Sequence, residues 1–155
     1  MTTKLSILSA AGDVQIEHVR QFIRNYVAWL GVDLSFQDFD QEMASLPGPY
    51  APPAGRLFYA ERDGHPAGCV AIRPFSAGLC ELKRLYVEPS QRSYGVGRDL
   101  TLAAIKAAKE IGYRKLLLDT LPAMRVAVKL YRELGFKETP DRKSTRLNSS
   151  HANIS

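Results

Sequence analysis

The sequence feature that most constrains the fold is a glycine-rich turn, residues 92–97, between a strand-like run at residues 80–87 and a helix-like run from Arg98. A short apolar run of strand length follows the helix at residues 115–119. Two strands joined by one helix pack as a parallel, right-handed crossover. A glycine turn that enters a helix also presents backbone N–H groups and the positive end of the helix dipole. This unit predicts a parallel strand pair with an anion site at the turn. The alternative is a turn that binds nothing and contains glycine only because its backbone conformation requires it.

The remaining segments predict a mixed sheet that is mostly antiparallel. Two runs flank Asp63-Gly64, a dipeptide that favours a tight hairpin, and a third run follows a second turn, so three strands form an antiparallel meander. Apolar residues at helical spacing predict the helices. The predicted segments are strands at residues 4–8, 56–62, 66–73, 80–87 and 115–119, helices from 13 to about 30, 36–46, 98–112 and 122–135, and a strand that begins at Phe136.

Length, charge and composition exclude several classes. The 155 residues suit one domain, and 45% hydrophobic with 24% charged residues is ordinary globular composition. The net charge of +5 includes +2 from the last fifteen residues, and no basic stripe with interleaved aromatics is present, so no nucleic acid is expected as partner. Neither a membrane-spanning run nor a signal peptide is recognised, so we expect a cytoplasmic protein with no membrane partner. Cys69, Cys80 and three scattered histidines lack metal-ligand spacing; no metal is expected, and both cysteines are predicted to be buried.

Residues 141–155 do not continue this pattern. They are rich in Ser, Asn and basic residues and contain almost no apolar side chain, a composition that predicts disorder. The run also looks like a translated cloning adapter. We therefore expect a domain at residues 1–140 and a disordered, non-native tail at residues 141–155.

Three segments carry a resemblance to a known family. They are Glu-Leu-Lys-Arg-Leu-Tyr-Val-Glu-Pro at residues 81–89, Arg-Ser-Tyr-Gly-Val-Gly-Arg at 92–98, and Leu-Tyr-Arg-Glu-Leu-Gly-Phe at 130–136. In order and spacing they resemble the GCN5-related N-acetyltransferase (GNAT) superfamily, whose pattern [Gln/Arg]-x-x-Gly-x-[Gly/Ala] fits the middle segment. The resemblance implies the α/β (α+β) acyl-CoA N-acyltransferase fold, a mixed, mostly antiparallel central sheet with helices on both faces. The family's C-terminal strand pair is expected to be incomplete here, because the matching pattern breaks off near Pro140.

The resemblance also implies the acyl donor. In that family the turn binds the pyrophosphate of acetyl-CoA through backbone N–H groups, and the preceding strand carries a bulge whose backbone holds the pantetheine arm and the acetyl carbonyl. The bulge groups are matched here to Leu85 and Val87. Arg98 is either a charge near the phosphates or an exposed solubilising residue. The residues matched to the turn are Arg92, Ser93, Tyr94, Gly95, Val96, Gly97 and Arg98.

Two side chains are candidates for proton transfer. Tyr131 matches the tyrosine that the family uses as general acid toward the coenzyme A thiolate; otherwise it is an amphipathic core residue. Glu81 lies eleven residues before Arg92, where histone-type members place a catalytic glutamate. It is either the general base or a cross-strand salt-bridge partner, with water then taking the proton.

The expected function is N-acetyl transfer, in which a primary amine of a small molecule or a protein attacks acetyl-CoA directly. Arg73, Lys83 and Arg84 could receive an acceptor carboxylate, or they are ordinary strand-face charges. The alternative is a noncatalytic acyl-CoA-binding or sensor domain. Expected partners are acetyl-CoA and the amine acceptor, and the chain could form a homodimer.

Overall fold

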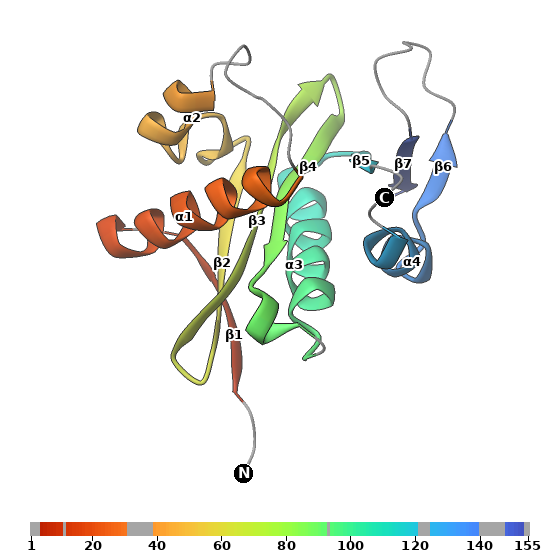
Figure 1. The fold of residues 1–155 in the computed structure, drawn as a ribbon. Helices are drawn as coiled ribbons and strands as arrows, with labels where there is room; N and C mark the ends of the chain where they lie inside the picture. Colours follow the sequence, from red (N-terminus) through yellow and green to blue (C-terminus); the bar gives the residue numbers. More distant parts are fainter. Residues whose placement is uncertain are drawn as a thin grey trace.

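The computed structural model describes residues 4–10, 12–30, 39–92, 94–120, 125–139 and 148–153. Its strands form one mixed sheet (Figure 1). The β4–β5 pair is parallel and the other neighbouring pairs are antiparallel, so the predicted mixed sheet is confirmed. Across the sheet the order is β1 (Leu5–Ser9), β2 (Arg56–Arg62), β3 (His65–Ser76), β4 (Leu79–Val87), β5 (Lys115–Thr120), β7 (Asn148–Asn153) and β6 (Lys137–Thr139).

Helices cover both faces of the sheet. On one face α1 (Gly12–Leu30) and α2 (Phe39–Ser45) bury an apolar cluster that includes Cys69 and Ala71 of β3. On the other face α3 (Val96–Ile111) and α4 (Arg125–Glu133) bury a second cluster with Val70 and Ile72. Successive β3 residues thus point to opposite sides, so β3 is buried on both of its faces.

Local sequence explains the connections. Asp63 and Gly64 have φ values of +53° and +81°, the pair of left-handed residues that a type I′ hairpin turn requires. Gly112 ends α3 in the left-handed conformation and donates its N–H to the Ala108 and Lys109 carbonyls. Short 3-10 turns lie at Gly48–Tyr50 and at Pro89–Gln91, the latter between β4 and the glycine turn.

The predicted disorder of the tail is wrong for Asn148–Asn153. These residues form β7, which pairs with β5 along one side and with β6 along the other (Figure 1). The C-terminal strand pair is therefore formed, although β6 contributes three residues. Composition predicted disorder because Ser, Asn and basic residues offer little apolar surface for burial. A strand flanked on both sides is nevertheless held by backbone hydrogen bonds that any residue except proline can make. The non-native origin of the tail and the domain limit at residue 140 stay predictions.

Both cysteines are buried and free, as expected. Burial raises the pKa of the Cys80 thiol to about 12 and that of Cys69 further still. Because the thiolate is the reactive form, neither residue should react with a thiol reagent in the folded protein at neutral pH. A colorimetric disulfide reagent should detect no thiol in native protein and both thiols in guanidinium chloride. A cysteine that reacts rapidly without denaturant would contradict this packing.

Within the described part of the chain, no helix has the length and apolar character to cross a bilayer.

Candidate active site between β4 and β5

The two parallel strands at the centre of the sheet separate along their length. They pair through Leu79 with Lys115, Cys80 with Leu116, and Glu81 with Leu117. Beyond Glu81, β4 continues to Val87 with no paired strand on the β5 side among the described residues, while β5 continues alongside β7. One edge of β4 therefore has no strand partner over residues 82–87 among the described residues, and we call this unpaired stretch the opening between β4 and β5.

A bulge shapes that edge of β4. The register passes from Cys69 opposite Tyr86 to Ala71 opposite Lys83, so Arg84 and Leu85 together face one residue of β3. Arg84 takes a φ of +60°, as the extra residue of a bulge can. A bulge in this strand was implied by the family resemblance, and the structure confirms it.

Hydrogen bonds define which way the backbone of Val87 points. The Glu88 N–H donates to the Ala67 carbonyl of β3 at 2.8 Å. Because N–H and C=O groups alternate sides along a strand, those of Val87 point away from β3, toward the opening. The guanidinium of Arg92 reaches the Val87 carbonyl from that side, with Nε at 3.2 Å, and the Val87 N–H points the same way.

The glycine turn ends at the N-terminus of α3. Gly95 is the N-cap residue, with φ of +79° and no side-chain capping bond, so the first N–H groups of the helix receive no cap from it. Gly97 has no positive φ, and a Cβ there would lie 3.5 Å from Val87 and 3.7 Å from Leu130, which is ordinary contact. Gly97 is therefore not required by the protein's own packing, whereas Gly95 is required by backbone conformation.

The contacts that hold this turn join residues far apart in the chain, and local sequence does not indicate them. The Arg62 guanidinium lies 3.6 Å above the exposed ring of Tyr94, and its Nε donates to Gln91 Oε1 at 2.6 Å. No local motif indicates the contact between Arg62 and Tyr94, because Arg62 comes from the distant β2–β3 hairpin. Val96 is buried, Arg98 is exposed, and Ser93 lies outside the described residues.

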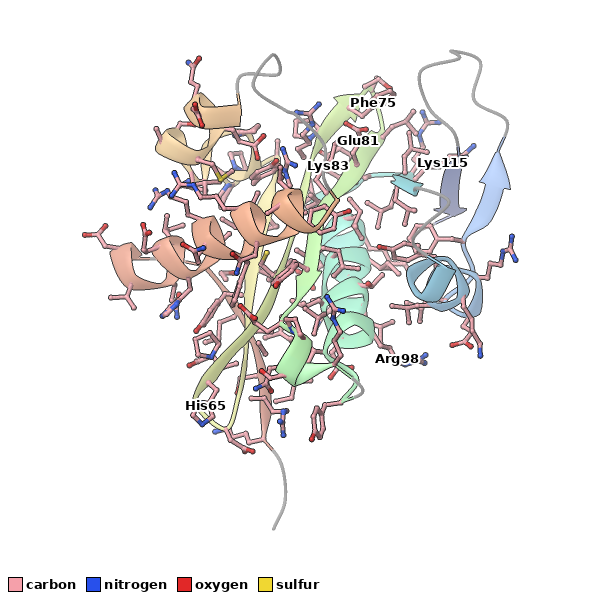
Figure 2. The ribbon with its side chains drawn as sticks, viewed as in Figure 1. His65, Phe75, Glu81, Lys83, Arg98 and Lys115 are labelled. Carbon is pink, nitrogen blue, oxygen red and sulfur yellow. The ribbon has the colours of Figure 1, made fainter. Side chains whose placement is uncertain are left out.

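Glu81 lies at the last β4–β5 pair, where the opening begins. It is 2% exposed, and its carboxylate contacts Arg73 Nε at 3.2 Å and Lys83 Nζ at 3.9 Å. Figure 2 shows Glu81 and Lys83 together on β4, with Arg98 near the other end of the opening. Glu81 is therefore a salt-bridge partner in the structure, and its role as general base stays a prediction. Arg84 does not join this group, because it pairs with Glu42 of α2.

Tyr131 of α4 is buried on the α3 side of the sheet. It is 4% exposed and its ring meets that of Phe136 edge-on at 5.6 Å between centroids. Burial raises the pKa of its phenol well above the ordinary value, and the nearby Tyr26 phenol raises it further. Tyr26 belongs to α1 and packs with Tyr86 on the opposite face, so the two tyrosines approach each other from the two faces of the sheet. Nothing in the local sequence around Tyr26 indicates this approach.

Comparison with known proteins gives consistent likenesses. A family model described as "Acetyltransferase (GNAT) family" matches residues 22–136. An uncharacterized N-acetyltransferase of Schizosaccharomyces pombe is 36% identical over 139 residues, covering 88% of this chain and 85% of that protein. A GNAT-family acetyltransferase of Staphylococcus aureus Mu50 shares the fold, with a TM-score of 0.81, 17% identity, and coverage of 98% of this chain and 100% of that one. The PaiA N-acetyltransferase of Thermoplasma acidophilum, solved with coenzyme A, gives a TM-score of 0.73 at 19% identity over 99% of each chain.

Proposed function

This chain belongs to the acetyltransferase (GNAT) family, and from that premise we propose that it transfers the acetyl group of acetyl-CoA to a primary amine. The observation that carries the proposal is the opening between β4 and β5, which has an outward-facing β4 backbone at one wall and the N-terminus of α3 at one end.

The donor would bind along this opening. The uncapped N–H groups at the start of α3 suit the pyrophosphate of acetyl-CoA, because a helix N-terminus combines free donors with the positive end of the dipole. Gly97 leaves room there for close approach, and Arg98 lies in the first turn of the same helix, where its charge favours a phosphate. The edge of β4 would then bond the amide groups of the pantetheine arm much as another strand would.

The reaction proceeds by direct attack. The amine nitrogen, once deprotonated, attacks the thioester carbon, and the carbonyl oxygen becomes an oxyanion that the Val87 N–H stabilises. The nitrogen, positively charged after the attack, releases its extra proton to solvent as the carbon–sulfur bond breaks, which leaves the neutral acetamide product and the coenzyme A thiolate. The Tyr131 phenol donates its proton to that thiolate and recovers one from solvent. The raised pKa of Tyr131 keeps this proton in place at neutral pH.

Glu81 is assigned the proton that the attacking ammonium loses. The assignment is supported by its position at the start of the opening and by its contacts with the Arg73 and Lys83 cations. Glu81→Gln should therefore lower kcat by about 100-fold, the contribution typical of a general base. Steady-state kinetics measure this, with Glu110→Gln on the exposed surface of α3 as the control. Full activity in Glu81→Gln would assign the proton to water instead.

The proposal is tested by binding and turnover together. Calorimetry with acetyl-CoA should show binding, and release of coenzyme A thiol should be followed over amino acids, polyamines, arylamines and lysine peptides. Because both protein thiols are buried, a thiol reagent reports the coenzyme alone. Binding without turnover for every amine would favour the noncatalytic acyl-CoA sensor, and absence of binding would refute both functions.

A further inference from the structure

Arg84, the bulge residue of β4, has a backbone conformation that an arginine does not favour. Its φ of +60° is in the left-handed region. Among the described residues one other non-glycine has a positive φ, Asp63, and aspartate tolerates this conformation in a turn. For arginine the conformation is strained, so neighbouring contacts must hold it.

The contacts come from one carboxylate of α2. Arg84 Nη2 donates to Glu42 Oε1 at 2.9 Å and Arg84 Nε donates to Glu42 Oε2 at 3.1 Å, a bidentate pair. The Tyr50 hydroxyl donates to the same Oε2 at 2.8 Å. Both charged side chains are largely buried, at 18% and 16% exposed, so solvent screens the pair only weakly. We name Glu42, Tyr50 and Arg84 the bulge clamp.

The clamp residues are themselves fixed. The guanidinium of Arg20 in α1 donates to the Met43 carbonyl at 2.7 Å, and Met43 is fully buried. This bond anchors the turn of α2 that carries Glu42. Tyr50 is 1% exposed, and burial raises the pKa of its phenol to about 12, so the hydroxyl remains a donor at neutral pH. The Cys69 thiol also donates to the Arg84 carbonyl at 3.3 Å.

Because β4 lacks a strand partner at the opening, the position of its bulge depends on the contacts of the bulge clamp. Past Glu81, β4 pairs with β3 alone among the described elements. No second neighbouring strand therefore fixes the position of the bulge in β4. The bulge sets the register of Tyr86 and Val87 against β3. We propose that the Glu42 carboxylate is a positioning group for acetyl transfer, which acts through Arg84 and the bulge to aim the Val87 N–H. This inference rests on the proposed function.

Two variants, with alanine or with glycine in place of Arg84, separate the effect of backbone strain from the effect of losing the guanidinium charge. Arg84→Ala removes the clamp and keeps the strain, whereas Arg84→Gly removes the clamp and also the strain, because glycine takes a positive φ freely. We expect kcat to fall about tenfold or more in Arg84→Ala and in Glu42→Gln, a part of what loss of an oxyanion donor costs. Arg84→Gly should keep severalfold more activity than Arg84→Ala, and adding Glu42→Gln to Arg84→Gly should cost little more.

The affinity for acetyl-CoA and the folded fraction provide the other readouts. Calorimetric affinity should fall less than kcat in any clamp variant, because the pyrophosphate site at α3 is untouched and only the contacts of the β4 edge are displaced. Glu110→Gln on the exposed surface of α3 is the control, because it removes a carboxylate away from the clamp and should leave kcat as in the wild type. Equal losses in Arg84→Ala and Arg84→Gly would overturn the proposal. So would a Glu42→Gln protein that melts earlier but retains full kcat when folded.

A spectroscopic readout separates this inference from the proposed function. In ¹⁵N-labelled protein, the amide signals of Tyr86 and Val87 should shift in Arg84→Ala and return toward the wild-type positions in Arg84→Gly. This holds whether or not any amine is acetylated. Unchanged Val87 signals in Arg84→Ala would refute the clamp, whereas a shifted signal in a protein without turnover would refute the acetyltransferase proposal alone.

Discussion

Tyr131→Phe should lower kcat for acetyl transfer by about 100-fold, within the range that a general acid contributes. The ring is 4% exposed and packs edge-on against Phe136, so phenylalanine keeps this contact and removes only the hydroxyl. The loss should therefore appear in kcat, with little change in the calorimetric affinity for acetyl-CoA. Stopped or continuous thiol-release assays at saturating donor and acceptor measure it.

The matched control is Tyr113→Phe. It also removes a hydroxyl that makes one hydrogen bond, to the Ala54 carbonyl at 2.7 Å, but this hydroxyl has no part in the proposed reaction. We expect a lower melting temperature and an unchanged kcat. An unchanged kcat in Tyr131→Phe as well would remove Tyr131 from the mechanism.

The pH dependence follows from the direction of the pKa shift. Burial raises the pKa of Tyr131 above its ordinary value, so the phenol keeps its proton to higher pH than a free tyrosine. A general acid works while protonated. Loss of the Tyr131 proton should therefore not depress kcat anywhere below about pH 10, the ordinary tyrosine pKa.

Gly68→Ala should be the most damaging single-methyl change in the sheet. A Cβ at Gly68 of β3 would overlap the Tyr86 carbonyl oxygen and would lie 3.2 Å from the Val87 Cα. The obstacles are backbone atoms, so β4 itself must move. Overpacking of this kind costs about 1–3 kcal/mol, and the displaced Val87 N–H should also lower kcat. Thermal unfolding and steady-state kinetics test both effects.

Gly64→Ala provides the comparison. Its Cβ would meet nothing within 4 Å, and only its φ of +81° resists the change. The melting temperature should fall and kcat should not. If Gly68→Ala behaved in the same way as Gly64→Ala, the position of β4 would not matter for catalysis.

The turns and helices whose formation depends on neighbouring residues in the chain were predictable from the sequence. Asp63-Gly64 predicted its hairpin, the helical spacing predicted α1 to Leu30, and the glycine turn predicted the start of α3. In each case the deciding interactions lie within a few residues of each other. The sheet order around the crossover followed from chain connectivity alone.

The contacts of the site were less predictable because they join distant segments. Glu42 and Arg84 are 42 residues apart and meet because α2 packs over the bulge. Arg62 reaches Tyr94 only through the β2–β3 hairpin. A cross-strand salt bridge was one prediction for Glu81, but its partner Arg73 follows only from the register of β3 against β4. Order in β7 depended on β5 and β6, which its own composition does not reveal.

The short pairing of β4 with β5 also divides the molecule mechanically. One leaf holds β1 to β4 with the bulge, and the other holds β5, β6 and β7 (Figure 1). In the sheet the leaves meet through three residue pairs ending at Glu81 and Leu117, and α3 packs against strands of both leaves. The Val87 N–H belongs to the first leaf, and Tyr131 follows β5 in the chain, on the other side of this pairing. Under the proposed mechanism, the distance between the oxyanion donor and the general acid therefore depends on this short pairing and on α3, and not on either strand alone.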